Sequence, residues 1–242
     1  MRLWWRQQRG ILNAGVREVR MQAFNIEDII HEDEDIIVCR KHAGMAVQSA
    51  RSSQLDMESA LRNYLSQKSG EKAMPYIGII QRLDQPVEGV IIFAKNVLAA
   101  RDLSRQIQQN QIEKIYTVMV KGIIEQREGV LKDFLLKDGR SNTSSVVSKA
   151  TKGCKEAILS YKAQEIKGQN TILKINLQTG RHHQIRVQLA NAKMPIMGDR
   201  KYNPEDKETS QLALCASLIK FRHPKTGKEK KFEILPENPV FY

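Results

Sequence analysis

Two apolar runs separated by a polar segment stand out within residues 76–96. Both runs are rich in isoleucine and valine, which favour strands, and the segment between them contains Arg82, Asp84, Pro86 and Gly89. Proline fixes a backbone angle and glycine adopts conformations closed to other residues, so this segment is expected to turn. The pattern predicts a strand, an exposed loop that carries a carboxylate and a guanidinium, and a second strand.

Other apolar patterns predict further strands. Short apolar runs at residues 29–30 and 36–39 flank an acidic turn and indicate two strands. Residues 114–122 and 171–178 each have the pattern of one strand. Residues 122–160 favour a hairpin followed by a mobile basic loop.

Helical spacing appears in three segments. Residues 56–67 place apolar side chains three and four apart, with an acidic first turn and Gly70 just past the end. Asn96 is suited to cap a second helix, whose apolar residues are Val97, Leu98, Leu103 and Ile107. A short third helix fits Ile185 and Leu189, which are four apart, although the same segment also alternates as a strand would.

Clustered strands, hairpin signals and interspersed helices indicate an α+β fold with a mixed, largely antiparallel sheet and flanking helices. The 242 residues are 41% apolar and 27% charged, which suits one globular domain with a substantial core. No apolar run approaches the roughly 20 residues that a membrane span needs, and no signal peptide opens the chain. We therefore expect a single domain and no membrane partner.

Cysteine and histidine usage argues against a metal site. Cys39, Cys154 and Cys215 are odd in number and widely spaced, which favours free thiols in a reducing cytoplasm. His182 and His183 are adjacent, so on a strand or a helix their side chains diverge and share one ion poorly. The expectation is a cytoplasmic protein without a bound metal.

The net charge points to an anionic partner. A formal charge of +12 and a pI near 9.6 most simply suit nucleic acid, whose phosphates bind basic surfaces. Charge alone is weak evidence, because many basic proteins are merely soluble. Arg101 and Arg105, four apart on a predicted helix, fit a phosphate-binding ridge but more often mark a solvated face.

Three motifs occur in order along the chain. They are Arg82-Leu83-Asp84 with Gly89 and Ala94-Lys95, then Lys114-x-Tyr116 with Gly122, then Thr179-Gly-Arg-x-His-Gln-Ile-Arg186 with Gly198-Asp199 and Tyr202. Together they resemble the RNA pseudouridine synthases of the RluA-like branch, in the family's order and spacing. The resemblance runs from about Ile29 to Phe232 and includes the family's closing strand at residues 212–224.

The resemblance implies the pseudouridine synthase catalytic fold, with a central RNA-binding cleft. It also implies an enzyme that flips a uridine out of structured RNA, either large-subunit ribosomal RNA or transfer RNA, and isomerises it to pseudouridine. That reaction exchanges a bond from N1 to C1′ for one from C5 to C1′ without redox change, so no cofactor is expected. We further expect a monomer.

The resemblance also assigns roles to individual residues. Asp84 would be the nucleophile, and Arg186 its ion-pair partner, because a nearby guanidinium keeps a carboxylate ionised and oriented. Tyr116 would stack on the flipped base. Arg82 would fill the gap that the base leaves in the RNA, and Arg181 and Lys95 would contact phosphates. For Tyr116 the plainer alternative is a core residue, and for Arg181 a surface charge.

The chain departs from the family pattern at three positions. His42 stands where family members usually have proline, Gln81 where they have histidine before Arg-Leu-Asp, and Cys215 where they have histidine before Ala216. Glutamine keeps hydrogen-bonding capacity but cannot titrate. We expect activity to survive with Gln81, and we expect His42 to loosen a turn without removing chemistry.

Two other functions compete with this interpretation. One is a non-catalytic RNA-binding protein, which would be expected to have lost the carboxylate or the tyrosine. The other is a hydrolase that uses Asp84 on free nucleosides. Such enzymes pair two carboxylates, and Glu88, in the same predicted loop, is the available second acid.

Residues 1–20 differ from the rest of the chain. They hold both tryptophans and five arginines against one glutamate, a net charge of +4. We predict either a basic extension that orders on RNA or a start of translation at Met21, with the catalytic domain spanning residues 21–242.

A geometric prediction follows from the motifs. Asp84 and Arg186 lie roughly a hundred residues apart in sequence, and the fold should bring their charged groups within about 4 Å in a cleft lined by Tyr116. If Arg181 faced Asp84 instead, the third motif would still supply the ion-pair partner, but the choice of Arg186 as that partner would be wrong.

Overall fold

The computed structural model describes residues 24–49, 55–70 and 73–242. Its strands form one sheet in the order β1-β2-β4-β10-β5-β9-β8-β6-β7, with β11 paired to β10 and β3 to β4. In the described part of the chain every strand pair is antiparallel except β4 with β10. The predicted α+β fold with a mixed, largely antiparallel sheet is therefore confirmed. The extension at residues 1–20 lies outside the described residues and stays a prediction.

The strands are β1 (Ile29–Glu32), β2 (Ile36–Lys41), β3 (Gly78–Ile79), β4 (Glu88–Ala94), β5 (Glu113–Lys121), β6 (Glu128–Asp138), β7 (Thr143–Val147), β8 (Lys155–Lys167), β9 (Asn170–Leu177), β10 (Leu214–Arg222) and β11 (Glu229–Glu233). The α-helices are α1 (Met57–Ser69), α2 (Val97–Gln108) and α3 (Gln184–Asn191), and 3₁₀ turns occupy Ile26–Asp28 and Pro239–Phe241. No helix in these described stretches is long and apolar enough to cross a membrane.

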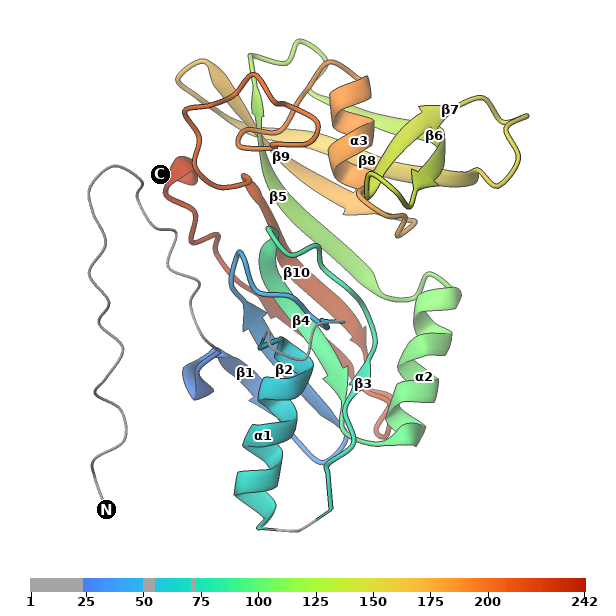
Figure 1. Cartoon of the computed structure of the whole chain (residues 1–242), viewed down its shortest axis with the longest axis vertical. Helices are drawn as coiled ribbons and strands as arrows, with labels where there is room; N and C mark the ends of the chain where they lie inside the picture. The colour runs from blue at the N-terminus through green and yellow to red at the C-terminus, as the bar shows by residue number, and fades with distance from the viewer. Residues whose placement is uncertain (1–23, 50–54, 71–72) are drawn as a thin grey trace.

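Figure 1 shows β5 and β10 running along the middle of the molecule. Strands β1, β2 and β4 lie with α1 and α2 toward one end, and β6, β7 and β8 lie with α3 toward the other. The loop between β3 and β4 carries Arg82-Leu83-Asp84 of the first motif, and α3 carries Gln184-Ile185-Arg186 of the third. The sheet thus joins two motif-bearing regions that are distant in sequence.

Helices α1 and α2 pack on opposite faces of the sheet. Alternate residues of β2 separate into two clusters, with Ile37 on the α1 side and Ile36 on the α2 side. Leu61 of α1 belongs to the first cluster, and Leu103 of α2 to the second. All seven residues of β4 are buried, as expected for a strand covered on both faces.

Both predicted helix starts are confirmed. Asp56 accepts a hydrogen bond from the Ser59 amide at 2.8 Å, and Asn96 accepts one from the Ala99 amide at 2.8 Å. These bonds satisfy donors that the first turn of a helix leaves unpaired. The end of α1 also follows the prediction, because Gly70 adopts a left-handed conformation with φ of 68°.

Two details of the predicted helices and loops need correction. Val97 and Leu98 are 63% and 77% exposed, because the face of α2 that meets the sheet is set by Ala99 and Leu103 instead. The hairpin predicted within residues 122–160 is confirmed by the β6–β7 pairing. Its supposed loop is shorter than expected, because Lys155 already begins strand β8.

Gly89 is required where β4 approaches β10. Its φ is 148°, and a Cβ placed there would lie 2.4 Å from the Cβ of Ala216. No other residue type fits this approach without moving one of the strands. The close contact fixes the start of β4, and therefore the exit of the loop that carries Asp84.

Candidate active site

Asp84, Tyr116 and Arg186 line the same cavity, which has a volume of about 490 Å³. The residues come from the β3–β4 loop, strand β5 and helix α3 respectively. A second cavity of about 880 Å³ shares Asp84 and Arg186 with the first. The three residues predicted to be catalytic are therefore brought together.

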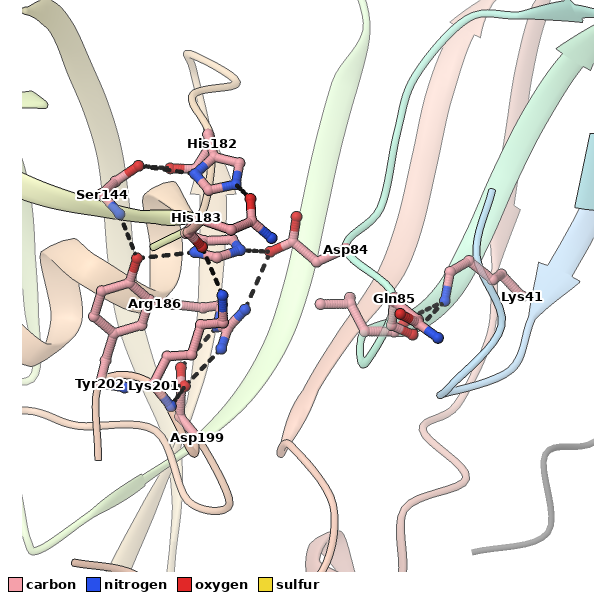
Figure 2. Close-up of polar contacts among 12 residues, drawn as sticks. Lys41, Asp84, Gln85, Ser144, His182, His183, Arg186, Asp199, Lys201 and Tyr202 are labelled. Carbon is pink, nitrogen blue, oxygen red and sulfur yellow. Dashed lines mark hydrogen bonds and ion pairs between the residues drawn. The ribbon is translucent and has the colours of Figure 1, made fainter. Parts of the chain in front are cut away.

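A buried lysine donates hydrogen bonds to the backbone of the loop that carries Asp84. Lys41 is fully buried, and its Nζ donates to the backbone oxygens of Gln85 at 3.0 Å, Val87 at 2.6 Å and His42 at 3.0 Å. Figure 2 shows it reaching the loop at Gln85. Burial lowers the pKa of Lys41 to about 7, against the opposing effect of Asp84 and Glu88. The sequence signal for this role is a lysine at the end of a strand that begins with four apolar residues.

Arg186 connects Asp84 to a second carboxylate. Its Nη1 lies 3.5 Å from Oδ2 of Asp84, whereas Nε and Nη2 contact Asp199 at 2.8 and 2.7 Å. The predicted approach of Arg186 to Asp84 is thus confirmed. Two parallel bonds to one carboxylate fix the plane of the guanidinium, so Asp199 determines where Arg186 points (Figure 2).

Asp199 is a buried anchor that the sequence reasoning did not assign to the site. Its side chain is 1% exposed, and its Oδ1 also accepts from the backbone amides of Lys201 and Tyr202. Burial alone would lower the pKa of Arg186, but the Asp199 and Asp84 carboxylates reverse that effect and raise it. Arg186 therefore keeps its charge. The available signal was the Gly198-Asp199 pair in the third motif.

Tyr116 presents an undissociated phenol to the cavity. It is 7% exposed, and burial raises its pKa, with a further contribution from the nearby charge of Asp84. No hydrogen bond joins its hydroxyl to any residue that the structure describes. The ring and hydroxyl are thus available to a molecule in the cavity.

His183 and Tyr202 complete the surroundings of Asp84. Nε2 of His183 lies 3.6 Å from Oδ2 of Asp84, and its Nδ1 lies 2.8 Å from the hydroxyl of Tyr202. The rings of His182 and His183 are stacked with centroids 3.8 Å apart, so the expectation that these side chains diverge is wrong. The reason is that His183 has a left-handed backbone, with φ of 54°, between the strand and the helix.

Arg82 and Arg181 lie at the cavity rim. Both are exposed and line both cavities. In the described part of the chain no hydrogen bond or ion pair joins Arg181 to Asp84, and its Nε donates to the backbone oxygen of Glu156 at 2.8 Å. Among the described residues Arg82 has no hydrogen-bond or ion-pair partner. Its guanidinium is therefore free to bind an anion or to stack.

Lys95 lies elsewhere. Its Nζ donates to Glu32 at 2.7 Å and to the backbone oxygen of Asp33 at 2.5 Å, and it lines neither cavity. The position follows from the strand, since Lys95 comes after the end of β4 that is distant from the Asp84 loop. A role in phosphate binding stays a prediction, to which this geometry adds no support.

Glu88 is not a loop residue. It is the first residue of β4, is 4% exposed, and accepts hydrogen bonds from the backbone amides of Glu237 and Asn238. It lines neither cavity. The paired-carboxylate hydrolase therefore lacks its second acid at Asp84.

Of the three departures from the family pattern, Gln81 lines the first cavity, whereas His42 and Cys215 line neither. Gln81 donates to the backbone oxygen of Val90 at 3.4 Å. His42 lies between two carboxylates, 2.6 Å from Asp28 and 2.8 Å from Glu237. Cys215 is fully buried, and burial raises the pKa of its thiol. None of them contacts Asp84.

A potential metal-ligand group lies far from the cavity. Asp33, Asp35 and His223 place ligand atoms within 4.8 Å of one another. The oxygens of Asp33 already have partners, since Oδ1 accepts two backbone amides and Oδ2 lies 3.0 Å from both His31 and His223. This bonding accounts for the cluster without an ion.

Comparisons with known proteins identify the class of enzyme to which this fold and site belong. The pattern of the family described as RNA pseudouridylate synthase matches residues 35–191. The chain is 31% identical to the RNA pseudouridine synthase YlyB of Bacillus subtilis (strain 168), over 87% of this chain and 70% of the relative. It is also 31% identical to the ribosomal large subunit pseudouridine synthase D of Vibrio cholerae, over 88% of this chain and 68% of the relative.

A solved structure shows the same fold. The human RNA pseudouridylate synthase domain containing 4 superimposes with a TM-score of 0.72 at 20% identity, covering 88% of this chain and 90% of that chain. The chain belongs to the RNA pseudouridylate synthase family and is an RNA pseudouridine synthase, an isomerase.

Proposed function

We propose that Asp84 is the nucleophile with which this enzyme isomerises uridine to pseudouridine. The observation that carries the proposal is the position of Asp84. It lies in a cavity that Tyr116 also lines, and it is within reach of the charged Arg186. Glu88, the other acid of this segment, is buried in β4 and bonded to backbone amides. Asp84 is therefore the carboxylate placed to meet a base in the cavity.

The proposed reaction balances without a co-reactant. The bond from N1 to C1′ of the uridine breaks, the uracil rotates within the site, and a bond from C5 to C1′ forms. The proton leaves C5, and N1 regains a proton. Asp84 attacks C1′ as the uracil leaves, and the bond it forms breaks again when C5 bonds to C1′. Arg186 directs the carboxylate. Tyr116 supplies the aromatic surface for the freed uracil and lies near the C5 proton.

The adjoining cavity and its rim suit the RNA strand. Arg82 and Arg181 line both cavities, and we infer that Arg181 contacts phosphates while Arg82 occupies the gap left by the flipped nucleotide. The family relationship supports an RNA substrate. The name of the Vibrio cholerae relative favours large-subunit ribosomal RNA over transfer RNA as the target.

We further propose that the enzyme acts as a monomer. An enzyme that acts on ribosomal RNA without a membrane partner is expected in the cytoplasm, and the proposed chemistry requires neither metal nor cofactor.

Tritium release from RNA labelled at uridine C5 tests the proposal. The wild type should release tritium and form pseudouridine in large-subunit ribosomal RNA. Asp84→Asn is nearly isosteric and removes only the charge, so it should bind the RNA with little change and release no tritium. Turnover by this variant at near the wild-type rate would overturn the mechanism.

Product analysis separates the competing functions. A hydrolase would release free uracil from nucleosides, and a non-catalytic RNA-binding protein would bind the RNA without tritium release by either the wild type or the variant. Glu88→Gln is a useful comparison, because Glu88 is an acid near Asp84 in sequence that lines neither cavity.

A further inference from the structure

A second polar group faces Asp84 besides Arg186. Nε2 of His183 lies 3.6 Å from the same carboxylate oxygen that Arg186 approaches at 3.5 Å. The His183 side chain is 5% exposed, whereas that of Asp84 is 31% exposed. Hydrogen bonds to catalytic groups are often long without substrate and shorten in the complex. The imidazole is therefore placed to influence the carboxylate.

The hydrogen bonds around Tyr202 determine which nitrogen of His183 carries the proton. The Ser144 backbone amide, which can only donate, bonds the Tyr202 hydroxyl oxygen at 2.7 Å. The hydroxyl proton is then free to be donated to Nδ1 of His183, 2.8 Å away. The Asp84 carboxylate that faces Nε2 accepts hydrogen bonds, which favours this direction. A neutral imidazole that accepts at Nδ1 carries its hydrogen on Nε2, which is the nitrogen that faces Asp84.

The ring is also held firmly in this direction. His183 has a left-handed backbone, with φ of 54° and ψ of 23°, a conformation that residues other than glycine adopt at a cost and that is common at functional sites. Its ring stacks on the ring of His182 and makes an edge-to-face contact with the ring of Tyr202. A strained backbone and a fixed ring together point Nε2 at the carboxylate (Figure 2).

We propose that His183 is a positioning residue, which donates a hydrogen bond from Nε2 to Asp84 in its neutral form and orients the carboxylate for attack. Tyr202, through its bond to Nδ1, fixes the tautomer that makes this donation possible. The role rests on the proposed function of Asp84. It differs from that of Arg186, because a neutral donor directs the carboxylate without adding a second full charge that would weaken it as a nucleophile.

The charges around the ring favour the neutral form. Burial lowers the pKa of His183 to about 4, Asp84 opposes this, and the charge of Arg186 adds to the lowering. The nearby His182 and Lys201 act in the same direction as Arg186. At neutral pH the imidazole is thus a donor at one nitrogen and an acceptor at the other.

Chemical rescue distinguishes a donor from a residue that merely fills space. Glycine suits the φ of 54°, so His183→Gly should fold and leave a cavity beside Asp84. We expect its single-turnover rate to fall at least tenfold, with RNA affinity unchanged, and to recover when imidazole is added at pH 8. Added 1-methylimidazole has no N–H group and should give no recovery. Equal recovery with both compounds, or a wild-type rate without either, would overturn the proposal.

His182→Gly is the matched control, because His182 bonds Ser144 and Asn142 rather than Asp84. Imidazole should not raise the rate of this variant; an equal rise would show that the rescue does not involve the contact with Asp84. If His183→Gly does not fold, nitrogen NMR of the wild-type protein decides. The expected spectrum at pH 7 shows His183 protonated at Nε2 only, and protonation at Nδ1 overturns the proposal.

Tyr202→Phe tests the tautomer separately. Loss of the hydroxyl should lower kcat about tenfold and leave KM for RNA unchanged, since the ring of Tyr202 remains. An unchanged kcat contradicts the role given to Tyr202. These results are read only against a wild type that forms pseudouridine and an Asp84→Asn variant that does not. If Asp84→Asn is active, the proposed function is wrong. If Asp84→Asn is inactive and imidazole does not rescue His183→Gly, only the role given to His183 is wrong.

Discussion

Two charged clusters attached to the same sheet are built in opposite ways. In the Glu32 cluster, Glu32 accepts hydrogen bonds from Lys95 at 2.7 Å and from Lys68 and Tyr64 at 2.9 Å each. In the cavity, Asp84 has only the longer approaches of Arg186 at 3.5 Å and His183 at 3.6 Å. The carboxylate of Glu32 is fully engaged within the protein, and that of Asp84 retains capacity for another partner.

The difference separates charges that hold the fold from charges that await a substrate. Burial alone would raise the pKa of Glu32, but Lys95, Lys68 and Tyr64 lower it to about 2. The basic groups differ in the same way, because Lys95 is bound to Glu32 whereas Arg82 has no ion-pair partner among the described residues. Unused bonding capacity in a cavity is thus the structural sign of function in this molecule.

The largest effect is expected from Arg186→Ala. It should leave the 1% exposed Asp199 without its ion-pair partner, at a cost of about 3–5 kcal/mol in the free energy of unfolding. The rate of pseudouridine formation should fall by about 10² to 10³, as for other lost electrostatic contacts at active sites. Urea unfolding and single-turnover assays measure both effects.

Arg186→Lys and Arg181→Ala are the matched controls for that variant. Lysine restores a charge near Asp199 but cannot form the two parallel bonds of a guanidinium, so stability should recover more than activity does. Arg181→Ala removes a rim charge and should cost far less of both. If Arg181→Ala were as inactive as Arg186→Ala, the assignment of Arg186 as the partner of Asp84 would be wrong.

The Glu32 cluster should show its structural role in acid. The pKa of Glu32 is lowered to about 2 in the folded protein from an ordinary 4.5, so its stabilisation is present above pH 4.5 and is lost as the pH falls toward 2. The loss is at most about 3 kcal/mol. Urea unfolding of the wild type and of Glu32→Gln between pH 2 and 6 should show it, with the variant less sensitive to pH. Equal pH dependence of the two proteins would contradict the assignment.

Arg82→Ala should change RNA binding, whereas Lys95→Ala should change stability. Arg82→Ala should weaken RNA binding and reduce the salt dependence of the binding constant by about one charge, with stability changed by less than about 0.5 kcal/mol. Lys95→Ala should lower stability by about 1 kcal/mol and leave RNA affinity unchanged. Binding titrations at several salt concentrations and thermal unfolding provide the comparison. A loss of RNA affinity in Lys95→Ala would instead support the phosphate contact predicted from sequence.

The sequence predicted the elements with local signals and missed those set by distant contacts. The cap at Asn96, the helix end just before Gly70 and the strand–loop–strand around Asp84 depend on neighbouring residues, and all are present. The position of Lys95 could not be predicted in this way, because Glu32 is 63 residues away in sequence and meets it only through the pairing of β2 with β4.

The same distinction applies within the site. The motifs indicated Asp84, Tyr116 and Arg186 through the family resemblance, and the fold brings them together. The two hydrogen bonds that Arg186 donates to Asp199, and the bond between Tyr202 and His183, depend on side-chain geometry across turns. Likewise, His183 has a left-handed backbone, so neither the strand nor the helix periodicity from which the ring directions were inferred applies to it.

Pseudouridine mapping in cells tests the central claim most directly. Ribosomal and transfer RNA would be sequenced for pseudouridine from cells that lack the gene and from the same cells supplied with the wild type or with Asp84→Asn. The account predicts that one or more positions in large-subunit ribosomal RNA lose the modification, regain it with the wild type and fail to regain it with the variant. Restoration by Asp84→Asn, or no change at any position in either RNA, would contradict it.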